Sequence, residues 1–179
     1  LFPNKYTRDI FMDDYSLKNI ISNKIVLSDY PRNVAFYNEE LKKTIIDKYN
    51  LKDKKVYAYM PTWRGSSRNA NIYTQKRIIH QLLKEIDNCL QNDQTLFINL
   101  HFLIGNNIDL SCFKHIKMFP KEYETYDFLN VCDVLITDYS SVFFDFAVTG
   151  RKIILFTYDL EEYMNERGMY FSIDDLPFP

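Results

Sequence analysis

The chain has 179 residues, of which 46% are apolar, and 22 Lys and Arg stand against 24 Asp and Glu. This length suits one domain with a sizeable core, and the net charge of −2 argues against a protein that binds nucleic acid through phosphate contacts. No apolar run reaches the roughly 18 residues that span a bilayer, and the start shows no signal-peptide pattern. Three cysteines without CxxC spacing predict reduced thiols, and we expect no metal and no cofactor.

The first fifty residues are typical of a connector. Residues 6–21 have the spacing of an amphipathic helix, and residues 24–27 suit a short strand. Asn38 precedes two glutamates, which favours a helix that begins there, because carboxylates stabilise a helix N-terminus. Both ends of the chain look cut. We therefore expect a segment of a longer protein, in which residues 1–50 form a connector and the edge of a missing N-terminal domain.

From residue 51 onward, apolar strands alternate with helical segments. Runs of β-branched and aromatic residues predict strands at 55–60, 95–100, 115–119, 133–137 and 152–156. Helical spacing between them predicts helices at 74–90, 125–132 and 141–149, the last ended by Gly150. Apolar runs without alternation suit parallel strands that are covered on both faces. Residues 51–179 are therefore predicted to form a doubly wound α/β domain with a Rossmann-like parallel sheet.

Unusual residues gather at the carboxyl ends of the predicted strands, where ligands bind to open parallel sheets. They follow the first, second and fourth strands: Thr62 and Arg64, then His101, then Asp138, Ser140 and Ser141. Their common position at one edge of the sheet predicts a ligand site there.

The turn at 137–141 has the composition of a phosphate site. The hydroxyls of Ser140 and Ser141 and the positive end of the following helix would bind an anion, and Arg64 would neutralise it through two N–H groups. Simpler roles fit as well. Either serine suits a helix N-cap, and Arg64 suits a surface position over Trp63.

Two further residues extend this site. His101 is as easily structural as functional; as an imidazolium it would donate to a phosphate oxygen or stabilise a leaving group. Asp145 comes one helical turn after Ser141, where its carboxylate would either accept hydrogen bonds from ligand hydroxyls or lie on the helix surface. The acidic and aromatic residues 158–163 predict a solvated loop.

Taken in order, several motifs resemble the CDP-glycerol glycerophosphotransferase family, which comprises teichoic-acid primases and polymerases and their relatives in capsule synthesis. The motifs are YPRN at 30–33, YMPTWR at 59–64, LH at 100–101, DVLITDYSSVFFD at 133–145, YDLEEY at 158–163 and RGMY at 167–170. The resemblance implies a GT-B enzyme of two Rossmann-like halves. Residues 51–179 would be the nucleotide-binding C-terminal half.

The resemblance also implies the reaction. The donor would be CDP-glycerol, or CDP-ribitol as in some members, and the acceptor a lipid-linked or polymeric hydroxyl of teichoic-acid or capsule type. That hydroxyl would attack the phosphorus that bears glycerol, and CMP would leave. The full-length protein is expected in the cytoplasm, peripheral at the inner face of the plasma membrane. The segment by itself is expected to be inactive without its N-terminal half, which carries the family's catalytic base.

Carried over by position, the resemblance implies a role for each candidate residue. Arg64, Ser140 and Ser141 would hold the diphosphate. His101 would take the place of the catalytic histidine of this half, and Asp145 would reach the ribose.

Three more residues complete the implied binding set. Arg32 would brace the cleft between the two halves. Thr62 and Asp138 would belong to the donor site. Apart from the resemblance, the spacing of the aspartates demands no cation, but Asp138 would be the first candidate ligand if Mg²⁺ held the diphosphate.

Two other interpretations fit the sequence. Phe102 stands where the family usually has proline, and Val34 where it usually has aspartate. These departures allow a GT-B sugar transferase for a surface glycan that uses another nucleotide sugar. A non-catalytic nucleotide-binding α/β module would use the serine turn only as a helix cap, but this leaves the clustering at the strand ends unexplained.

Overall fold

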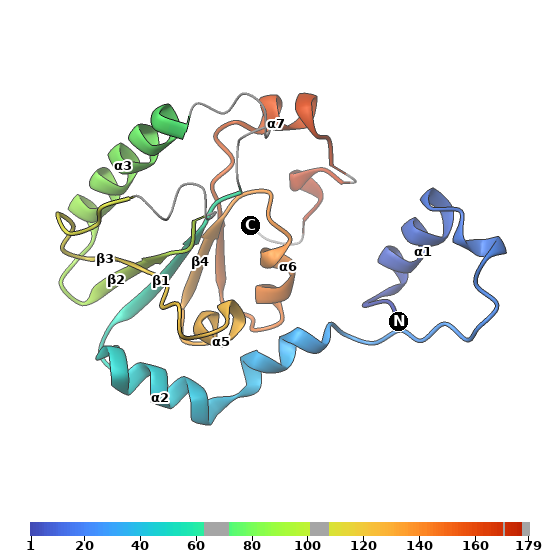
Figure 1. Cartoon of the computed structure of the whole chain (residues 1–179), viewed down its shortest axis with the longest axis horizontal. Helices are drawn as coiled ribbons and strands as arrows, with labels where there is room; N and C mark the ends of the chain where they lie inside the picture. The colour runs from blue at the N-terminus through green and yellow to red at the C-terminus, as the bar shows by residue number, and fades with distance from the viewer. Residues whose placement is uncertain (63–71, 101–107, 170, 177–179) are drawn as a thin grey trace.

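A parallel sheet forms the centre of the structure, a computed structural model that describes residues 1–62, 72–100, 108–169 and 171–176, without the side chains of 72–75. Its five strands lie in the order β3-β2-β1-β4-β5, and all pairings are parallel (Figure 1). They are β1 (Lys55–Met60), β2 (Gln94–Ile98), β3 (Ile116–Met118), β4 (Val134–Thr137) and β5 (Lys152–Leu155). This order confirms the predicted doubly wound, Rossmann-like sheet.

Helices lie on both faces of the sheet (Figure 1). The described α-helices are α1 (Lys5–Asp14), α2 (Glu39–Tyr49), α3 (Ile72–Cys89), α5 (Thr125–Leu129), α6 (Val142–Ala147) and α7 (Leu160–Glu166). Short 3-10 helices are η1 (Leu17–Asn19), η2 (Pro31–Tyr37) and η3 (Ile173–Asp175). The predicted boundaries of α3, α5 and α6 differ from these by no more than three residues.

Strand β2 shows why its apolar run does not alternate with polar residues. Leu96 and Ile98 pack on one face against Leu83 of α3. Phe97 points to the other face, where its ring meets Phe128 of α5 with centroids 4.7 Å apart. Successive side chains of a strand point to opposite faces, so a strand that is covered on both sides needs apolar residues at every position.

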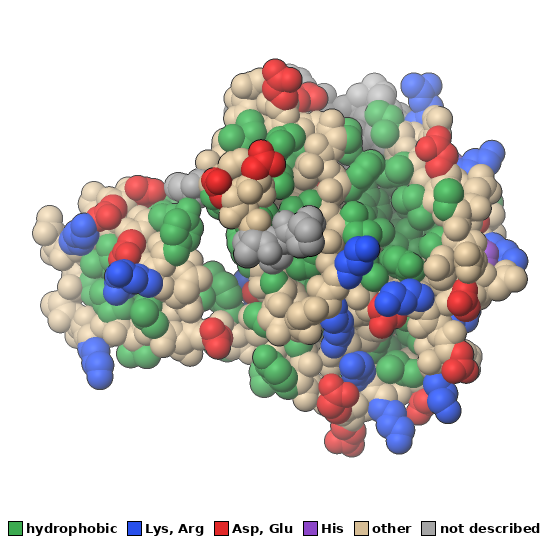
Figure 2. Space-filling model, turned by 180° about the vertical axis from the view of Figure 1, so that it is seen from behind, with side chains coloured by type: hydrophobic (Ala, Val, Ile, Leu, Met, Phe, Trp, Pro, Cys, Tyr) green, Lys and Arg blue, Asp and Glu red, His purple; other side chains and the backbone are tan. Residues whose placement is uncertain are grey.

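The segment before the sheet departs from the prediction. The predicted helix over 6–21 is wrong beyond α1, because the chain turns at Ser16, which adopts a left-handed φ of 53°. The predicted strand at 24–27 is wrong as well: within residues 1–62, this stretch makes one isolated bridge, from Leu27 to Phe2. A strand needs a continuous partner, and no described strand lies beside this segment, which projects from the sheet (Figure 1 and Figure 2).

Residues 31–51 pack against the sheet. As predicted, Asn38 caps α2, and its side-chain oxygen accepts the Leu41 N–H at 3.1 Å. Phe36 of η2 and Ile45 of α2 are buried in the same core as β1. The division into residues 1–50 and 51–179 stays a prediction.

Three smaller findings complete the fold. Cys89 and Cys112 are exposed, Cys132 is buried, and all three are free thiols, as predicted. The predicted loop at 158–163 is wrong, because most of it belongs to helix α7. Among the described helices, none combines the length and the apolar character needed to cross a membrane.

Candidate functional site

The candidate site lies where the strand order reverses, between β1 and β4. In open α/β sheets, ligands bind outside the carboxyl ends of the strands at such a switch point. The chain segments that leave the two strands are bonded together there. The Thr62 N–H donates to both carboxylate oxygens of Asp138, at 2.9 and 3.0 Å, and the Thr137 hydroxyl donates to the Met60 carbonyl at 2.6 Å.

Asp138 anchors this edge of the sheet. Its side chain is buried, and Oδ1 also accepts the Tyr139 N–H at 2.6 Å. A carboxylate that accepts backbone N–H groups from two segments fixes both segments relative to each other. The described bonds of Asp138 therefore set the path of the chain after β1 and after β4 at the same time.

The two serines of the turn differ in exposure and bonding. Ser140 is half-buried, and its hydroxyl oxygen accepts the Val142 N–H at 3.4 Å. Ser141 is exposed at the N-cap position of α6, and its side chain makes no capping hydrogen bond. The helix-cap interpretation therefore does not account for Ser141, and the turn is open to the surface at the switch point.

Arg32 and Asp145, 113 positions apart in the chain, form an ion pair. Asp145 Oδ2 accepts hydrogen bonds from Nη2 and Nε of Arg32, at 2.9 and 3.2 Å, and from the Tyr126 hydroxyl, at 2.7 Å. The Asp145 side chain is only 1% exposed, whereas that of Arg32 is 44% exposed. Asp145 is thus not a charge on the helix surface, which excludes the simpler interpretation of this residue.

The two residues that donate hydrogen bonds to Asp145, Arg32 and Tyr126, both have a raised pKa. The hydrogen bond to Asp145 raises the pKa of Arg32 above its usual value. Burial, and then the hydrogen bond to Asp145, raise the pKa of Tyr126 to about 12. Tyr126 is therefore neutral at physiological pH and can act as a hydrogen-bond donor.

Two tyrosines of this cluster were not among the predicted site residues. Tyr30 places its ring 4.1 Å from the guanidinium carbon of Arg32, and the Tyr126 ring lies 5.6 Å from it. The sequence could have indicated Tyr30, since this residue is the first of the YPRN motif. No sequence pattern indicated Tyr126, because only the fold brings α5 beside α6 and η2.

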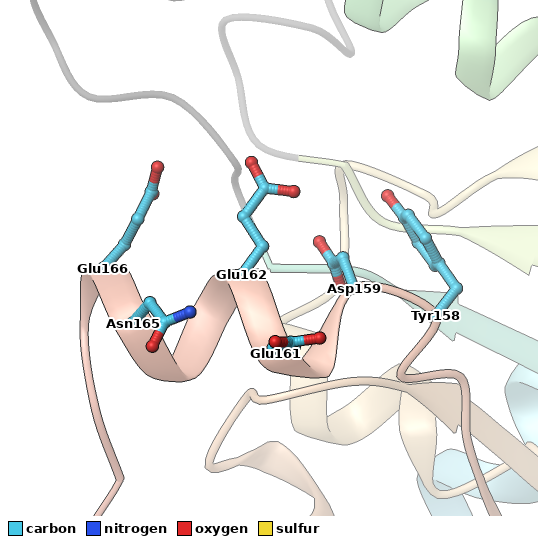
Figure 3. A pocket seen from close by; sticks show the side chains of 6 residues that line it. All are labelled: Tyr158, Asp159, Glu161, Glu162, Asn165 and Glu166. Atoms are coloured by element: carbon cyan, nitrogen blue, oxygen red, sulfur yellow. The ribbon is translucent and has the colours of Figure 1, made fainter.

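An acidic pocket of about 570 Å³ lies along α7, lined by Tyr158, Asp159, Glu161, Glu162, Asn165 and Glu166 (Figure 3). Tyr139 ties α7 to the serine turn: its hydroxyl donates to Asp159 at 2.9 Å, and its ring stacks on Tyr163 at 3.8 Å. The side chains of Glu162 and Glu166 point to the same side of the helix (Figure 3). Because carboxylates repel phosphate, the described lining residues of this pocket do not attract an anionic ligand.

The remaining predicted site residues are not placed. Arg64 and His101 lie outside the described residues. Within the described ranges, no group of three or more His, Cys, Asp and Glu side chains is arranged to hold a metal ion.

Fold and site together define a Rossmann-like α/β domain of the GT-B type, with polar side chains at its switch point. The chain belongs to the CDP-glycerol:poly(glycerophosphate) glycerophosphotransferase family, whose model matches residues 1–178. The resemblance of the motifs is thereby confirmed.

Characterised relatives agree with this assignment. The teichoic acid poly(glycerol phosphate) polymerase of Bacillus spizizenii is 35% identical over 96% of this chain and 44% of its own length. The teichoic acid glycerol-phosphate primase of Bacillus subtilis is 34% identical over 92% of this chain and 42% of its own length.

Solved structures show the same relationship. The wall teichoic acid polymerase TagF is 31% identical, with a TM-score of 0.77, over 99% of this chain and 44% of that one. A TagF variant soaked for 30 minutes with CDPG is 32% identical, with a TM-score of 0.74, over 99% of this chain and 43% of the variant's chain. The chain spans less than half the length of these relatives.

Proposed function

We propose that this chain is the donor-binding part of a transferase that uses a CDP-activated polyol phosphate. CDP-glycerol is the expected donor, and glycerol phosphate passes to a teichoic-acid or capsule-type acceptor with release of CMP. Membership of the family supports this proposal. The observation that carries it is the exposed serine turn at the switch point of the sheet, tied by Asp138 to the chain that follows β1.

In this proposal the donor diphosphate lies over the turn after β4. The exposed Ser141 hydroxyl and the first N–H groups of α6 donate to its oxygens, with Ser140 beside them. Arg64 neutralises the charge. It follows Thr62 by two residues, and the Thr62 N–H is bonded to Asp138 beside the turn. Arg64 and the two serines would thus hold one ligand from the segments that follow β1 and β4.

The reaction needs positioning and charge stabilisation rather than a covalent enzyme intermediate. The acceptor oxygen attacks the phosphorus that bears glycerol, and its proton passes to a base. The bond from that phosphorus to the bridging oxygen breaks, and CMP leaves with the bonding electrons. We assign the stabilisation of the leaving CMP to His101 and the diphosphate residues, and the base to the rest of the protein.

The proposal extends to that remainder. The chain spans 44% of the length of the Bacillus spizizenii polymerase and of the TagF structure. We therefore expect the same protein to have an N-terminal half that faces this edge of the sheet and is joined to it through residues 1–50. Arg32 would brace the cleft between the halves. The acceptor would be lipid-linked or polymeric, so that the protein works in the cytoplasm at the inner face of the plasma membrane. Without its other half, the chain would bind the donor without turning it over.

Calorimetry on the 179-residue chain tests the proposal. We expect CDP-glycerol and CMP to bind more tightly than UDP or GDP. Replacing both serines (Ser140→Ala with Ser141→Ala) should weaken CDP-glycerol at least about tenfold, because two hydrogen bonds to a charged group are lost. Ser111→Ala, at an exposed serine outside the site, is the matched control and should bind normally. Equal affinity for all four ligands, or unchanged binding by the double variant, would refute the proposal.

A further inference from the structure

The carboxylate of Asp145 forms hydrogen bonds through only one of its oxygens. Oδ2 accepts three hydrogen bonds, from Nε and Nη2 of Arg32 and from the hydroxyl of Tyr126. Oδ1 is buried and accepts none from the described residues. A buried acceptor without a donor is unfavourable, and such an atom in a native structure calls for an explanation.

The arrangement of the donors produces this asymmetry. An arginine and a carboxylate commonly pair through two parallel bonds, one to each oxygen. Here both Arg32 groups converge on Oδ2, and the Tyr126 hydroxyl supplies a third bond to the same atom. The charge of Asp145 is thus compensated at Oδ2, while Oδ1 accepts no hydrogen bond from the described residues.

Buried acceptor atoms without a partner indicate the chemistry of a group that could bond to them. Oδ1 of Asn33, next to Arg32 in η2, is also buried and accepts no hydrogen bond from the described residues. Both unused atoms are acceptors, so they suit a group that donates, such as a hydroxyl. They do not suit a phosphate oxygen, which also accepts.

The position of Asp145 brings this acceptor close to the proposed donor site. It lies four residues after Ser141, which is about one turn along α6. The 44% exposure of the Arg32 side chain places the cluster directly beneath the surface. A ligand whose diphosphate lies on the serine turn therefore has its sugar or its polyol within about one helical turn of Asp145.

We propose that Tyr126 is a positioning residue that, with Arg32, occupies Oδ2 of Asp145 so that Oδ1 accepts a hydroxyl of the ligand. This inference rests on the proposed function, because the ligand is the CDP-activated donor. Both the ribose and the glycerol of that ligand carry hydroxyl groups that could donate this hydrogen bond.

The test compares Tyr126→Phe with the unaltered chain by calorimetry, using three ligands. CDP-glycerol carries both kinds of hydroxyl, CDP carries only those of ribose, and 2′,3′-dideoxy-CDP carries neither. We expect Tyr126→Phe to weaken CDP-glycerol about fivefold or more and to leave dideoxy-CDP within about twofold. A parallel loss with CDP identifies a ribose hydroxyl, and an unchanged affinity for CDP identifies a glycerol hydroxyl.

Controls separate this role from a structural one. Tyr49→Phe removes a tyrosine–carboxylate bond of the same type, to Glu122, and should leave all three affinities unchanged. Arg32→Lys keeps the charge but loses the paired N–H groups, and should give the same ligand pattern as Tyr126→Phe. Unfolding midpoints show whether each variant is folded.

The outcomes are distinct. An equal loss for all three ligands, dideoxy-CDP included, or no loss for any of them, would overturn the inference while the proposed function stands. No binding of CDP-glycerol by the unaltered chain would refute the proposed function, and the inference with it.

Discussion

Removing Arg32 should expose how strongly the fold depends on its ion pair with Asp145. Asp145 is 1% exposed, so Arg32→Ala leaves a buried carboxylate with the Tyr126 hydroxyl as its one remaining donor among the described residues. Breaking a fully buried pair costs about 3–5 kcal/mol. Because the Arg32 side chain is 44% exposed, water can reach the vacated space, and we expect a loss of about 2–3 kcal/mol in the free energy of unfolding.

A double-mutant cycle isolates the interaction. Asp145→Asn removes the buried charge at similar volume and should cost about 1–2 kcal/mol by itself. In that background, Arg32→Ala should cost less than about 1 kcal/mol, because no uncompensated charge remains. The coupling energy between the two positions should therefore be about 1 kcal/mol or more.

Urea unfolding followed by far-UV circular dichroism at pH 7 measures each term, provided that the slopes agree among the variants. Arg8→Ala is the control arginine. Its partner Asp9 is adjacent in the chain and about half exposed, so its loss should cost less than about 1 kcal/mol. If the two substitutions at Arg32 and Asp145 add within about 0.5 kcal/mol, the idea of a coupled buried pair is refuted.

Three further predictions concern other parts of the chain. Gly150→Ala and Gly168→Ala should each destabilise by about 1 kcal/mol, because their φ angles of 65° and 70° are left-handed; a neutral result in urea unfolding would contradict this. The hydrogen bond from Tyr49 is the main cause that lowers the pKa of Glu122 from 4.5 to about 2, so its contribution to stability is present above pH 4.5 and disappears toward pH 2. The stability lost in Tyr49→Phe should shrink over the same interval, and a constant difference would disprove the link. Burial raises the pKa of Cys132, so titration with a disulfide reagent at pH 8 should count two reactive thiols in the folded chain and three in denaturant.

The strands could be predicted because their signal is local. Lys55–Met60 was predicted with the observed bounds, and the other strands were found within two residues. A buried parallel strand needs apolar side chains at every position, so the composition of a few consecutive residues reveals it. Helix α2 was predictable for a similar reason, since its cap and its acidic first turn are adjacent in the chain.

The incorrect secondary-structure predictions lie where the local sequence signal is weak or fits both a helix and a loop. The turn at Ser16 carries no glycine to announce its left-handed backbone. Residues 24–27 have strand composition, yet a strand forms only when a partner lies beside it. For α7 a signal existed, because Asp159 stands at its N-cap and Glu161 and Glu162 in its first turn, where carboxylates favour a helix.

The sequence by itself determined the alternation of strands and helices, the family, and the placing of Thr62, Asp138 and the two serines at strand ends. Tertiary structure alone decided which of these side chains meet. The pairing of Arg32 with Asp145 joins residues 113 positions apart, and Tyr126 reaches them only because α5 and α6 cover the same face of the sheet. Secondary-structure propensity depends on residues that are close together in the sequence. The partners of a buried charge are instead the groups that the packed layers bring within hydrogen-bond distance, and no local sequence pattern determines which groups these are.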